Sequence, residues 1–396
     1  MHYPPSFFDT PIDRRGTDCE KWDAMSRRHG KRMLPMWVAD MDFPCPTAVS
    51  DALQKRALHP VYGYTEQTDA QVDALLAFAQ RRHGLTLQAS EQYTLPCVIT
   101  GLCAAVRALS KPGDGIIIQP PVYGPFFRTI ASNGRVVLEN NLLRDASGRY
   151  TMDFEGLEAL CKQGASAMLL CSPHNPVGRC WTKAELTQLW DILSKYNVAL
   201  ISDEIHWDFV YGKGAFTSVL ALPAAQNEHA RICMLTSVSK SFNLAGLLQA
   251  TLLIRNPELM QLLTAELQQS GATQGNLFSL AATEAAYREG DDWLDGLLAY
   301  VTVSKEILAK ELAARLPQVI MSPMEATYLA WLDCRAFGLS TEELLRRTHE
   351  QGLALTEGTF FGKEAGEGFL RVNLACPHSQ LEEAINRLEK ALSPKA

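Results

Sequence analysis

Five short apolar runs, spread from residue 115 to residue 254, constrain the fold of this chain more than any other feature of its sequence. Each run is almost continuously apolar, which is typical of strands that are covered on both faces of a sheet. Longer segments with helical periodicity separate the runs; in residues 182–196 one stripe carries Leu186, Leu189, Ile192 and Leu193. This alternation predicts an α/β domain with a mostly parallel sheet. The five runs are GIIIQ (115–119), AMLLCS (167–172), VALISDE (198–204), ICMLTS (232–237) and ATLLI (250–254).

The segments that flank this region have a different pattern. Residues 278–315 have helical periodicity, and two predicted strands (327–333 and 368–375) alternate with two further predicted helices (341–352 and 378–393). The first 45 or so residues are rich in Pro, Trp and Met and show no clear period. We therefore predict a large α/β domain over residues 46–288 and a smaller α+β domain formed by residues 1–45 and 289–396.

Composition excludes several classes of function. The net charge of −7 gives no reason to expect binding to nucleic acid or to an anionic membrane. No run of about eighteen apolar residues occurs, and the first residues lack the apolar stretch of a signal peptide, so we expect a cytoplasmic protein. The ten cysteines form no C-x-x-C pair and the histidines no H-x-x-x-H pair, which favours buried thiols in a reducing compartment and no metal site.

Polar residues follow three of the predicted strands directly. Asn175 lies in SPHNPVG, Asp203 in DEIHWD and Lys240 in SVSKSFNLAG. Ligands of open α/β sheets bind beyond the carboxyl ends of the strands, so these three side chains are expected to meet. Taken singly, each residue also has a purely structural explanation. Asn175 would lie in a turn, Asp203 would cap a helix and Lys240 would be a solvated charge.

The three residues together match the needs of a pyridoxal phosphate site. That cofactor needs a lysine amine to form an imine and move a proton, and a carboxylate to pair with its pyridinium nitrogen. Its phosphate needs backbone N–H groups at a helix N-terminus, which we expect from residues 100–103 before the helical pattern AAVRAL, and hydroxyls, which Ser237 and Ser239 offer. Tyr123 in PPVYGPF is a candidate for stacking on the ring; a turn-flanking aromatic is an equally good interpretation of that residue alone.

Longer motifs carry a resemblance to a known family. The ordered set resembles the fold-type I pyridoxal-phosphate enzymes of the aspartate aminotransferase superfamily, and within them the MalY/PatB group of cystathionine β-lyases and cysteine-conjugate C–S lyases. The similarity runs from about residue 10 to residue 390, and it implies a large domain with a seven-stranded type of mostly parallel sheet beside a smaller α+β domain. The motifs are WVADMDF (37–43), VYGYT (61–65), CSPHNPVGRCWT (171–182), ISDEIHWD (201–208), TSVSKSFNLAGL (236–247), TYLAWLD (327–333) and GFLRVNLACP (368–377).

The resemblance implies a role for each residue around the cofactor. Lys240 would be the Schiff-base lysine and proton carrier, Asp203 the partner of the pyridinium nitrogen and Asn175 the donor to the phenolic oxygen. Tyr123 would stack on the ring. The residues implied to bind the phosphate, or to lie beside it, are Gly101, Leu102, Cys103, Ser237 and Ser239.

The resemblance also implies how substrate binds and how subunits assemble. Arg371 would hold the substrate carboxylate with its planar fork, although by itself it reads as a surface arginine on a strand. Trp37, Asp40 and Tyr123 would complete the substrate site. Tyr64 would reach the phosphate of a neighbouring subunit, which implies a homodimer with shared sites.

Two positions depart from the aminotransferase pattern. Leu248 stands where many aminotransferases have a phosphate-binding arginine, and His206 stands where many have a tyrosine that donates to the phenolic oxygen. Both departures fit the lyase group better than a transaminase.

The predicted activity is α,β-elimination from cystathionine or a related cysteine S-conjugate, which gives pyruvate, ammonia and a thiol. An aminotransferase is the alternative enzyme, and a regulatory protein that keeps the pyridoxal-phosphate fold is the alternative outside catalysis. Trp37, Tyr62 and Trp207 are candidate pocket aromatics, with core packing expected for at least one. The choice of sulfur substrate depends on the pocket formed by segments 30–45 and 355–362.

Overall fold

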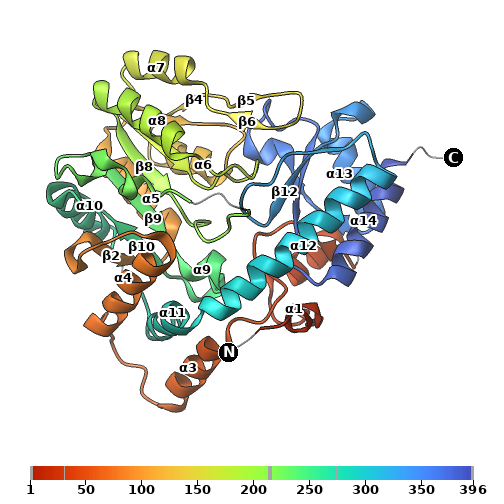
Figure 1. The fold of residues 1–396 in the computed structure, drawn as a ribbon, viewed down its shortest axis with the longest axis horizontal. Helices are drawn as coiled ribbons and strands as arrows, with labels where there is room; N and C mark the ends of the chain where they lie inside the picture. The colour runs from red at the N-terminus through yellow and green to blue at the C-terminus, as the bar shows by residue number, and fades with distance from the viewer. Residues whose placement is uncertain (1–2, 31, 213–215, 273–274, 394–396) are drawn as a thin grey trace.

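A seven-stranded sheet forms the centre of the structure (Figure 1). The computed structural model describes residues 3–30, 32–212, 216–272 and 275–393, so the ends of the predicted smaller domain, 1–2 and 394–396, lie outside the described residues. In spatial order the strands are β2 (Gln92–Leu95), β10 (Ala250–Leu253), β9 (Ile232–Thr236), β8 (Ala199–Asp203), β7 (Ala167–Cys171), β3 (Gly115–Ile118) and β4 (Val136–Glu139).

The predicted strands and their mostly parallel pairing are confirmed. All five apolar runs are strands of this sheet, and β4, β3, β7, β8 and β9 pair in parallel. The exception is β10, which runs antiparallel to both β9 and β2. The carboxyl ends of β7, β8 and β9 therefore lie at one edge of the sheet, as the sequence analysis required.

Successive residues of the central strands face two separate cores. In β7, Met168 and Leu170 pack in one hydrophobic cluster, while Leu169 packs in the other. The first cluster includes apolar residues of α4 (Asp69–His83), α7 (Phe154–Lys162) and α8 (Lys183–Lys195), and the second those of α5 (Val98–Leu109), α6 (Pro125–Ser132) and α10 (Pro257–Gln269). Helices on both faces explain why the strand sequences are apolar throughout.

A second sheet, drawn in blue, lies to the right of the first one in Figure 1, where the long helix α12 (Asp291–Arg315) crosses the molecule obliquely. Its order is β11 (Ile320–Met321), β12 (Leu329–Asp333), β15 (Phe369–Asn373) and β14 (Thr356–Glu357), all antiparallel. α13 (Thr341–Glu350) and α14 (His378–Leu392) pack beside it. This confirms the α+β character of the tail; the exact bounds of the two domains remain a prediction.

The N-terminal segment pairs with the C-terminal part of the chain. Its strand β1 (Leu34–Pro35) lies parallel to β13 (Leu353–Ala354) and is hydrogen-bonded to it. The other α-helices and strands are α1 (Pro5–Asp9), α2 (Met25–His29), α3 (Thr47–Leu58), β5 (Leu143–Arg144), β6 (Tyr150–Thr151), α9 (Val238–Ser241) and α11 (Leu277–Glu289), and α11 packs against α3 and α4. No helix among the described residues combines the length and apolar character needed to cross a membrane.

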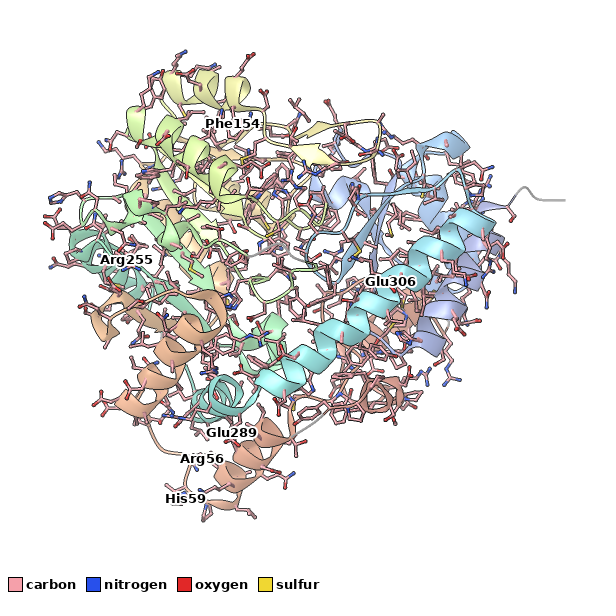
Figure 2. The ribbon with its side chains drawn as sticks, viewed as in Figure 1. Arg56, His59, Phe154, Arg255, Glu289 and Glu306 are labelled. Atoms are coloured by element: carbon pink, nitrogen blue, oxygen red, sulfur yellow. The ribbon has the colours of Figure 1, made fainter. Side chains whose placement is uncertain are left out.

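One segment projects from the body. After α3 the chain runs through residues 59–68 without a helix or strand and then enters α4 (Figure 1). Figure 2 shows Arg56 and His59 at the outer end of this projection. Nearly every residue from 58 to 68 is exposed, and the Tyr64 side chain is fully so.

Candidate active site

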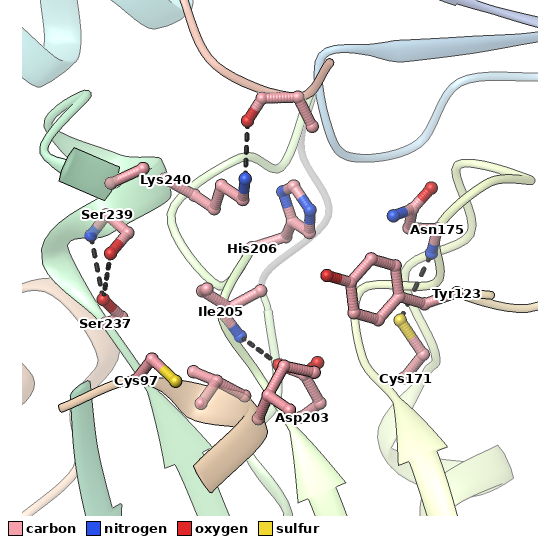
Figure 3. A pocket seen from close by; sticks show the side chains of 14 residues that line it. Cys97, Tyr123, Cys171, Asn175, Asp203, Ile205, His206, Ser237, Ser239 and Lys240 are labelled. Atoms are coloured by element: carbon pink, nitrogen blue, oxygen red, sulfur yellow. Dashed lines mark hydrogen bonds between the residues drawn. The ribbon is translucent and has the colours of Figure 1, made fainter. Parts of the chain in front are cut away.

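A cavity of about 180 Å³ lies beyond the carboxyl ends of β7, β8 and β9 (Figure 3). It contains the three strand-end residues that the sequence singled out, together with four more of the predicted site residues. The lining residues from that prediction are Tyr123, Asn175, Asp203, His206, Ser237, Ser239 and Lys240. The cavity also has lining residues that the prediction lacked: Ala39, Cys97, Val98, Ile99, Cys171, Ile205 and Ala245.

Asp203 is the last residue of β8 and is buried at the floor of the cavity. Its carboxyl group accepts one hydrogen bond, from the backbone N–H of Ile205 at 3.2 Å, and within the described part of the chain no cation lies within ion-pair distance of it. Burial raises the pKa of Asp203 to about 7, against a smaller opposing effect of the Ile205 N–H and Lys240. Such a group favours a ligand that brings a positively charged N–H.

Lys240 enters the cavity from α9, a single turn that Ser237 caps by accepting the N–H of Ser239. Its Nζ donates to the carbonyl of Ala39 at 2.6 Å, as Figure 3 shows. Burial lowers the pKa of Lys240 to about 8, and the positive charge of Arg371 acts in the same direction. At pH 7 roughly one tenth of this amine is therefore neutral, far more than in an ordinary lysine, and the neutral form is what a nucleophile or a proton acceptor needs.

The helix that opens onto the cavity begins earlier than the sequence suggested. α5 starts at Val98 with Cys97 as its N-cap, so Cys97, Val98 and Ile99 line the cavity. Gly101, Leu102 and Cys103 lie in the helix beyond its first turn and do not line it, because the Gly101 N–H already donates to the Cys97 carbonyl. The residues of α5 that line the cavity are thus Val98 and Ile99, which precede the predicted phosphate cradle at residues 100–103.

Gly101 serves packing instead. A Cβ at this position would collide with the side chains of Leu235 in β9 and Leu95 in β2. A signal for the true helix start was present: Val98, Leu102, Val106 and Leu109 recur at helical spacing and are all buried. The apolar stretch Cys97–Ile99 looked like a strand end because it precedes the glycine.

Arg371 reaches the cavity through Asn175. Its Nη1 donates to the Asn175 Oδ1 at 3.0 Å, and its Nη2 donates to the Trp37 carbonyl at 2.7 Å and the Thr356 hydroxyl at 3.2 Å. The side chain is buried, which lowers the pKa of Arg371 to about 10, and its Nε has no hydrogen-bond partner among the described residues. Arg371 is thus a buried cation rather than the surface residue that its strand position allowed.

Two more side chains complete the polar lining. The His206 ring lies beside Lys240 in Figure 3, its Nδ1 is buried without a partner in the described part of the chain, and burial holds the pKa of His206 well below its ordinary value. The imidazole is therefore neutral. Burial, with a contribution from Asp203, raises the pKa of Tyr123 to about 12, which keeps its phenol protonated.

The N-terminal candidates contribute differently from the expectation. The Trp37 ring donates to the Lys21 carbonyl and Asp40 pairs with Arg14 at 2.6 Å, and neither side chain lines the cavity. What faces the site from this segment is backbone, the carbonyls of Trp37 and Ala39.

Four further residues of the sequence analysis lie away from the cavity. Trp207 is a core residue, buried and stacked on the His83 ring. Tyr62, Tyr64 and Leu248 are exposed on the outside.

Comparison with known proteins identifies the family. The model of the family described as aminotransferase class I and II matches residues 32–388, which is most of the chain. The chain belongs to this family. Within it, the chain is 38% identical to cystathionine beta-lyase PatB of Bacillus subtilis (strain 168) over 389 residues, covering 98% of this chain and 100% of that protein. It is 33% identical to the protein MalY of Escherichia coli (strain K12), covering 97% of this chain and 98% of that one.

A solved member of the family has the same overall fold. Cystalysin from Treponema denticola, which contains pyridoxal 5′-phosphate, superposes with a TM-score of 0.93 at 33% identity, covering 97% of this chain and 98% of that one. The predicted fold-type I architecture and the predicted likeness to the MalY/PatB group are both confirmed.

The cavity of this aminotransferase class I and II protein fits pyridoxal phosphate. The unpaired carboxyl group of Asp203 suits the ring N–H, and the first amides of α5 with the hydroxyls of Ser237 and Ser239 suit the phosphate. The amine of Lys240 suits the aldehyde. No group of three or more His, Cys, Asp or Glu side chains suited to a metal ion occurs among the described residues.

Proposed function

We propose that this protein is a pyridoxal-phosphate-dependent β-lyase. It cleaves the carbon–sulfur bond of cystathionine or a related cysteine S-conjugate and releases pyruvate, ammonia and a thiol, which is homocysteine when cystathionine is the substrate. The observation that carries the proposal is the juxtaposition, in one cavity, of the buried unpaired Asp203 with the Lys240 amine. The similarity to cystathionine beta-lyase PatB supports elimination as the outcome.

Pyridoxal phosphate, when bound, supplies an aldehyde for the substrate amine and a ring that takes up the electrons freed at the substrate Cα. Asp203 would pair with the ring nitrogen and keep it protonated, which would keep the ring electron-poor. Asn175, the neutral His206 and Tyr123 line the same cavity and would contact the ring. The first turn of α5, with Ser237 and Ser239, would hold the phosphate.

Lys240 has two tasks in this scheme. Its amine would hold the cofactor at rest and, once free of it, would accept the Cα proton of the substrate. A pKa of about 8 suits the second task, because far more of the amine is neutral near pH 7 than in an ordinary lysine, while its conjugate acid is still able to give the proton up.

Arg371 orients the substrate. Its guanidinium group is the buried cation nearest Asn175, and it binds the substrate carboxylate by exchanging its bond to the Trp37 carbonyl for two charge-assisted bonds. That fixes the Cα–H bond toward Lys240. The thiolate then leaves from Cβ with the electron pair of the C–S bond, and the unsaturated amine that remains is hydrolysed by water to pyruvate and ammonia.

The test is a reaction of purified protein with L-cystathionine and added pyridoxal phosphate, in the absence of any keto acid. Pyruvate and free thiol in equal amounts are expected, with the visible band of the cofactor present throughout. A dependence of turnover on an added keto acid would contradict the proposal and identify a transaminase. Cofactor binding without turnover of any amino acid would favour a regulatory protein.

We further propose that the active form is a homodimer in which Tyr64 enters the site of the neighbouring copy. Support comes from the projecting segment, whose apolar side chains have no cover in one chain: Leu58, Val61, Tyr62 and Tyr64 are exposed, and Leu248 is exposed beside α3. Exposed apolar surface of this kind is typical of subunit contacts.

Subunit complementation tests the shared site. Tyr64→Ala and Lys240→Ala are each expected to be inactive or nearly so. Their co-expression gives mixed dimers with one intact site of two, and hence about half of the wild-type activity once these dimers are purified. No recovery in purified mixed dimers would contradict the placement of Tyr64.

We also propose that the protein works in the cytoplasm. All ten cysteines are free thiols, as expected in a reducing compartment. Cell fractionation checks this, and recovery in an exported fraction would contradict it.

A further inference from the structure

A buried carboxyl group lies directly behind the lysine. Asp208 is buried, and its two oxygens have one partner each: Oδ1 lies 2.9 Å from the His83 Nε2, and Oδ2 accepts the hydroxyl of Ser241. Ser241 follows Lys240 in the sequence. The carboxyl group thus joins the last residue of α4 to the turn that carries the lysine.

The surroundings leave Asp208 little freedom. The His83 ring stacks on Trp207 at 4.0 Å between centroids and contacts Phe78 edge-on at 5.9 Å. Trp207 is itself buried and packs against Phe78. Aromatic packing therefore fixes the ring that holds the carboxyl group, and the carboxyl group in turn has a fixed position from which to bind Ser241.

The turn that carries the lysine needs such support. α9 has 4 residues, too few to be stable through its own hydrogen bonds. Its first end is held by Ser237, whose hydroxyl donates to the Gln249 carbonyl and whose Oγ accepts from the Ser239 N–H. Its last residue, Ser241, is held by Asp208. Lys240 lies between the two attachments.

One short segment also links the lysine to the opposite side of the cavity. Asp203, which ends β8, and Asp208 are separated by only four residues, and His206 lies between them. Asp203 faces the cavity and Asp208 holds α9 from behind. The segment 203–208 thus fixes the distance between the ring-binding carboxyl group and the lysine.

We propose that Asp208, held by His83, is a positioning residue that places Lys240 for its reaction through the hydroxyl of Ser241. The inference rests on the role of Lys240 given under Proposed function. The charges that act on the Lys240 amine are those of Asp40, Arg371 and Asp203, so Asp208 acts through the geometry of α9.

Ser241→Ala is the primary test, because it removes one hydroxyl and leaves the buried carboxyl group bonded to His83. We expect kcat for pyruvate release to fall about tenfold with KM changed less than about twofold, since small displacements of a reacting group lower rates strongly. The midpoint of the pH titration of the cofactor's visible band should shift by about half a unit or more, because the lysine that forms the imine has moved. Ser241→Thr, which keeps the hydroxyl, should restore both values.

The matched control is Ser304→Ala. Ser304 is equally buried, and its hydroxyl donates to a helix carbonyl in α12, remote from the lysine. It should lower thermal stability as much as Ser241→Ala does, yet leave the pH midpoint and kcat unchanged. Asp208→Asn should shift the pH midpoint of the cofactor's visible band more than Ser241→Ala does. If Asp208→Asn fails to fold, the comparison of Ser241→Ala with Ser241→Thr still tests the inference.

The outcomes are distinguishable from failure of the proposed function. A normal wild-type band and turnover, together with a Ser241→Ala protein that matches Ser304→Ala in pH midpoint and kcat, would overturn this inference alone. A wild-type protein that forms no visible band with pyridoxal phosphate would overturn the role of Lys240 and this inference with it.

Discussion

The cavity has two walls that differ in how far their polar groups are already satisfied. The sheet wall, formed by Asp203 and His206 after β8, has a carboxyl group without a cation and a ring nitrogen without a partner among the described residues. The N-terminal wall, formed by residues 37–40 beside Arg371, is already bonded among the described residues except at the Arg371 Nε. Its carbonyls at Ala39 and Trp37 accept from Lys240 and Arg371.

The difference indicates that the two walls bind different ligands. The sheet wall is arranged in advance for a ligand that stays, because groups that lack partners gain them when that ligand binds. The N-terminal wall must exchange bonds when a substrate arrives, since the Lys240 amine donates to the Ala39 carbonyl and the Arg371 Nη2 donates to the Trp37 carbonyl. Permanent binding of the cofactor and transient binding of the substrate thus fall on opposite walls.

Buried side chains hold the N-terminal wall in place. The Asn373 Nδ2 donates to the carbonyls of Val38 and Asp40, each at 2.6 Å. Asp42, which is buried, bonds Lys21 at 2.8 Å and Arg14 at 2.8 Å. The wall therefore rests on bonds to the second sheet and to the first turns of the chain.

Removing the group that both walls share should have the largest effect. Lys240→Ala is expected to lower kcat by about 10³–10⁴-fold and to abolish the imine absorbance, because it removes both the cofactor attachment and the proton acceptor. Stopped-flow spectra with a pyruvate assay measure both. Retained turnover would contradict the assignment of Lys240.

Asp203→Asn tests the sheet wall and should lower kcat by about 10²–10³-fold, as loss of one preorganised electrostatic partner does. Asp203→Asn should also change the pH dependence of stability in the cofactor-free protein. Because the pKa of Asp203 is about 7 in the folded chain, well above its ordinary value, the folded state keeps a proton that the unfolded state releases. Stability should therefore fall as the pH rises from about 4 to 7, on the order of 4 kcal/mol for one such group.

Thermal unfolding across that pH range measures the effect. Asp203→Asn should make the decline shallower without removing it, since burial also raises the pKa of Glu204 to about 7. Loading the wild-type protein with cofactor should do the same, because a pyridinium partner lowers the pKa of Asp203. An unchanged slope in Asp203→Asn would contradict the description of the sheet wall.

Arg371→Lys tests the N-terminal wall at its cation. The lysine ammonium keeps the positive charge but cannot donate two parallel hydrogen bonds to a carboxylate as the planar guanidinium does. KM should therefore rise about 10- to 100-fold, with a smaller change in kcat. The control is Arg315→Lys, which changes an arginine paired with Glu389 far from the cavity. If KM stays the same while kcat falls, Arg371 acts on the reacting atoms rather than on substrate binding.

Asn373→Ala should give the smallest effect. Two carbonyls of the wall lose their donor, which should lower the free energy of unfolding by about 1–3 kcal/mol and raise KM about three- to tenfold. Steady-state kinetics and denaturant unfolding measure the two quantities. A loss of stability without any change in KM would show that the wall keeps its place without this residue.

The sequence revealed the sheet wall because its signals are carried by residue types. Buried parallel strands read as apolar runs, and the side chains that follow them must meet at one edge, so Asn175, Asp203 and Lys240 were found before the fold was known. The resemblance to the lyase group then added Arg371.

The N-terminal wall could not be read in the same way. Its contacts come from the carbonyls of Trp37 and Ala39, and every residue has a carbonyl, so residue type gives no signal there. The side chains of Trp37 and Asp40 looked functional but bond within their own neighbourhood. The start of α5 was misplaced because three apolar residues at a helix start do not differ from a strand end.

Successive side chains of a central strand pack in different cores, so the contributions of two adjacent residues to the free energy of unfolding should be independent. Leu169 and Leu170 are adjacent in β7, yet they contact different sets of helices. Truncating both should therefore cost the sum of the two separate losses. Substitutions in one core can thus be compensated by substitutions in the same core, with no change in the other, although the same strands contribute side chains to both.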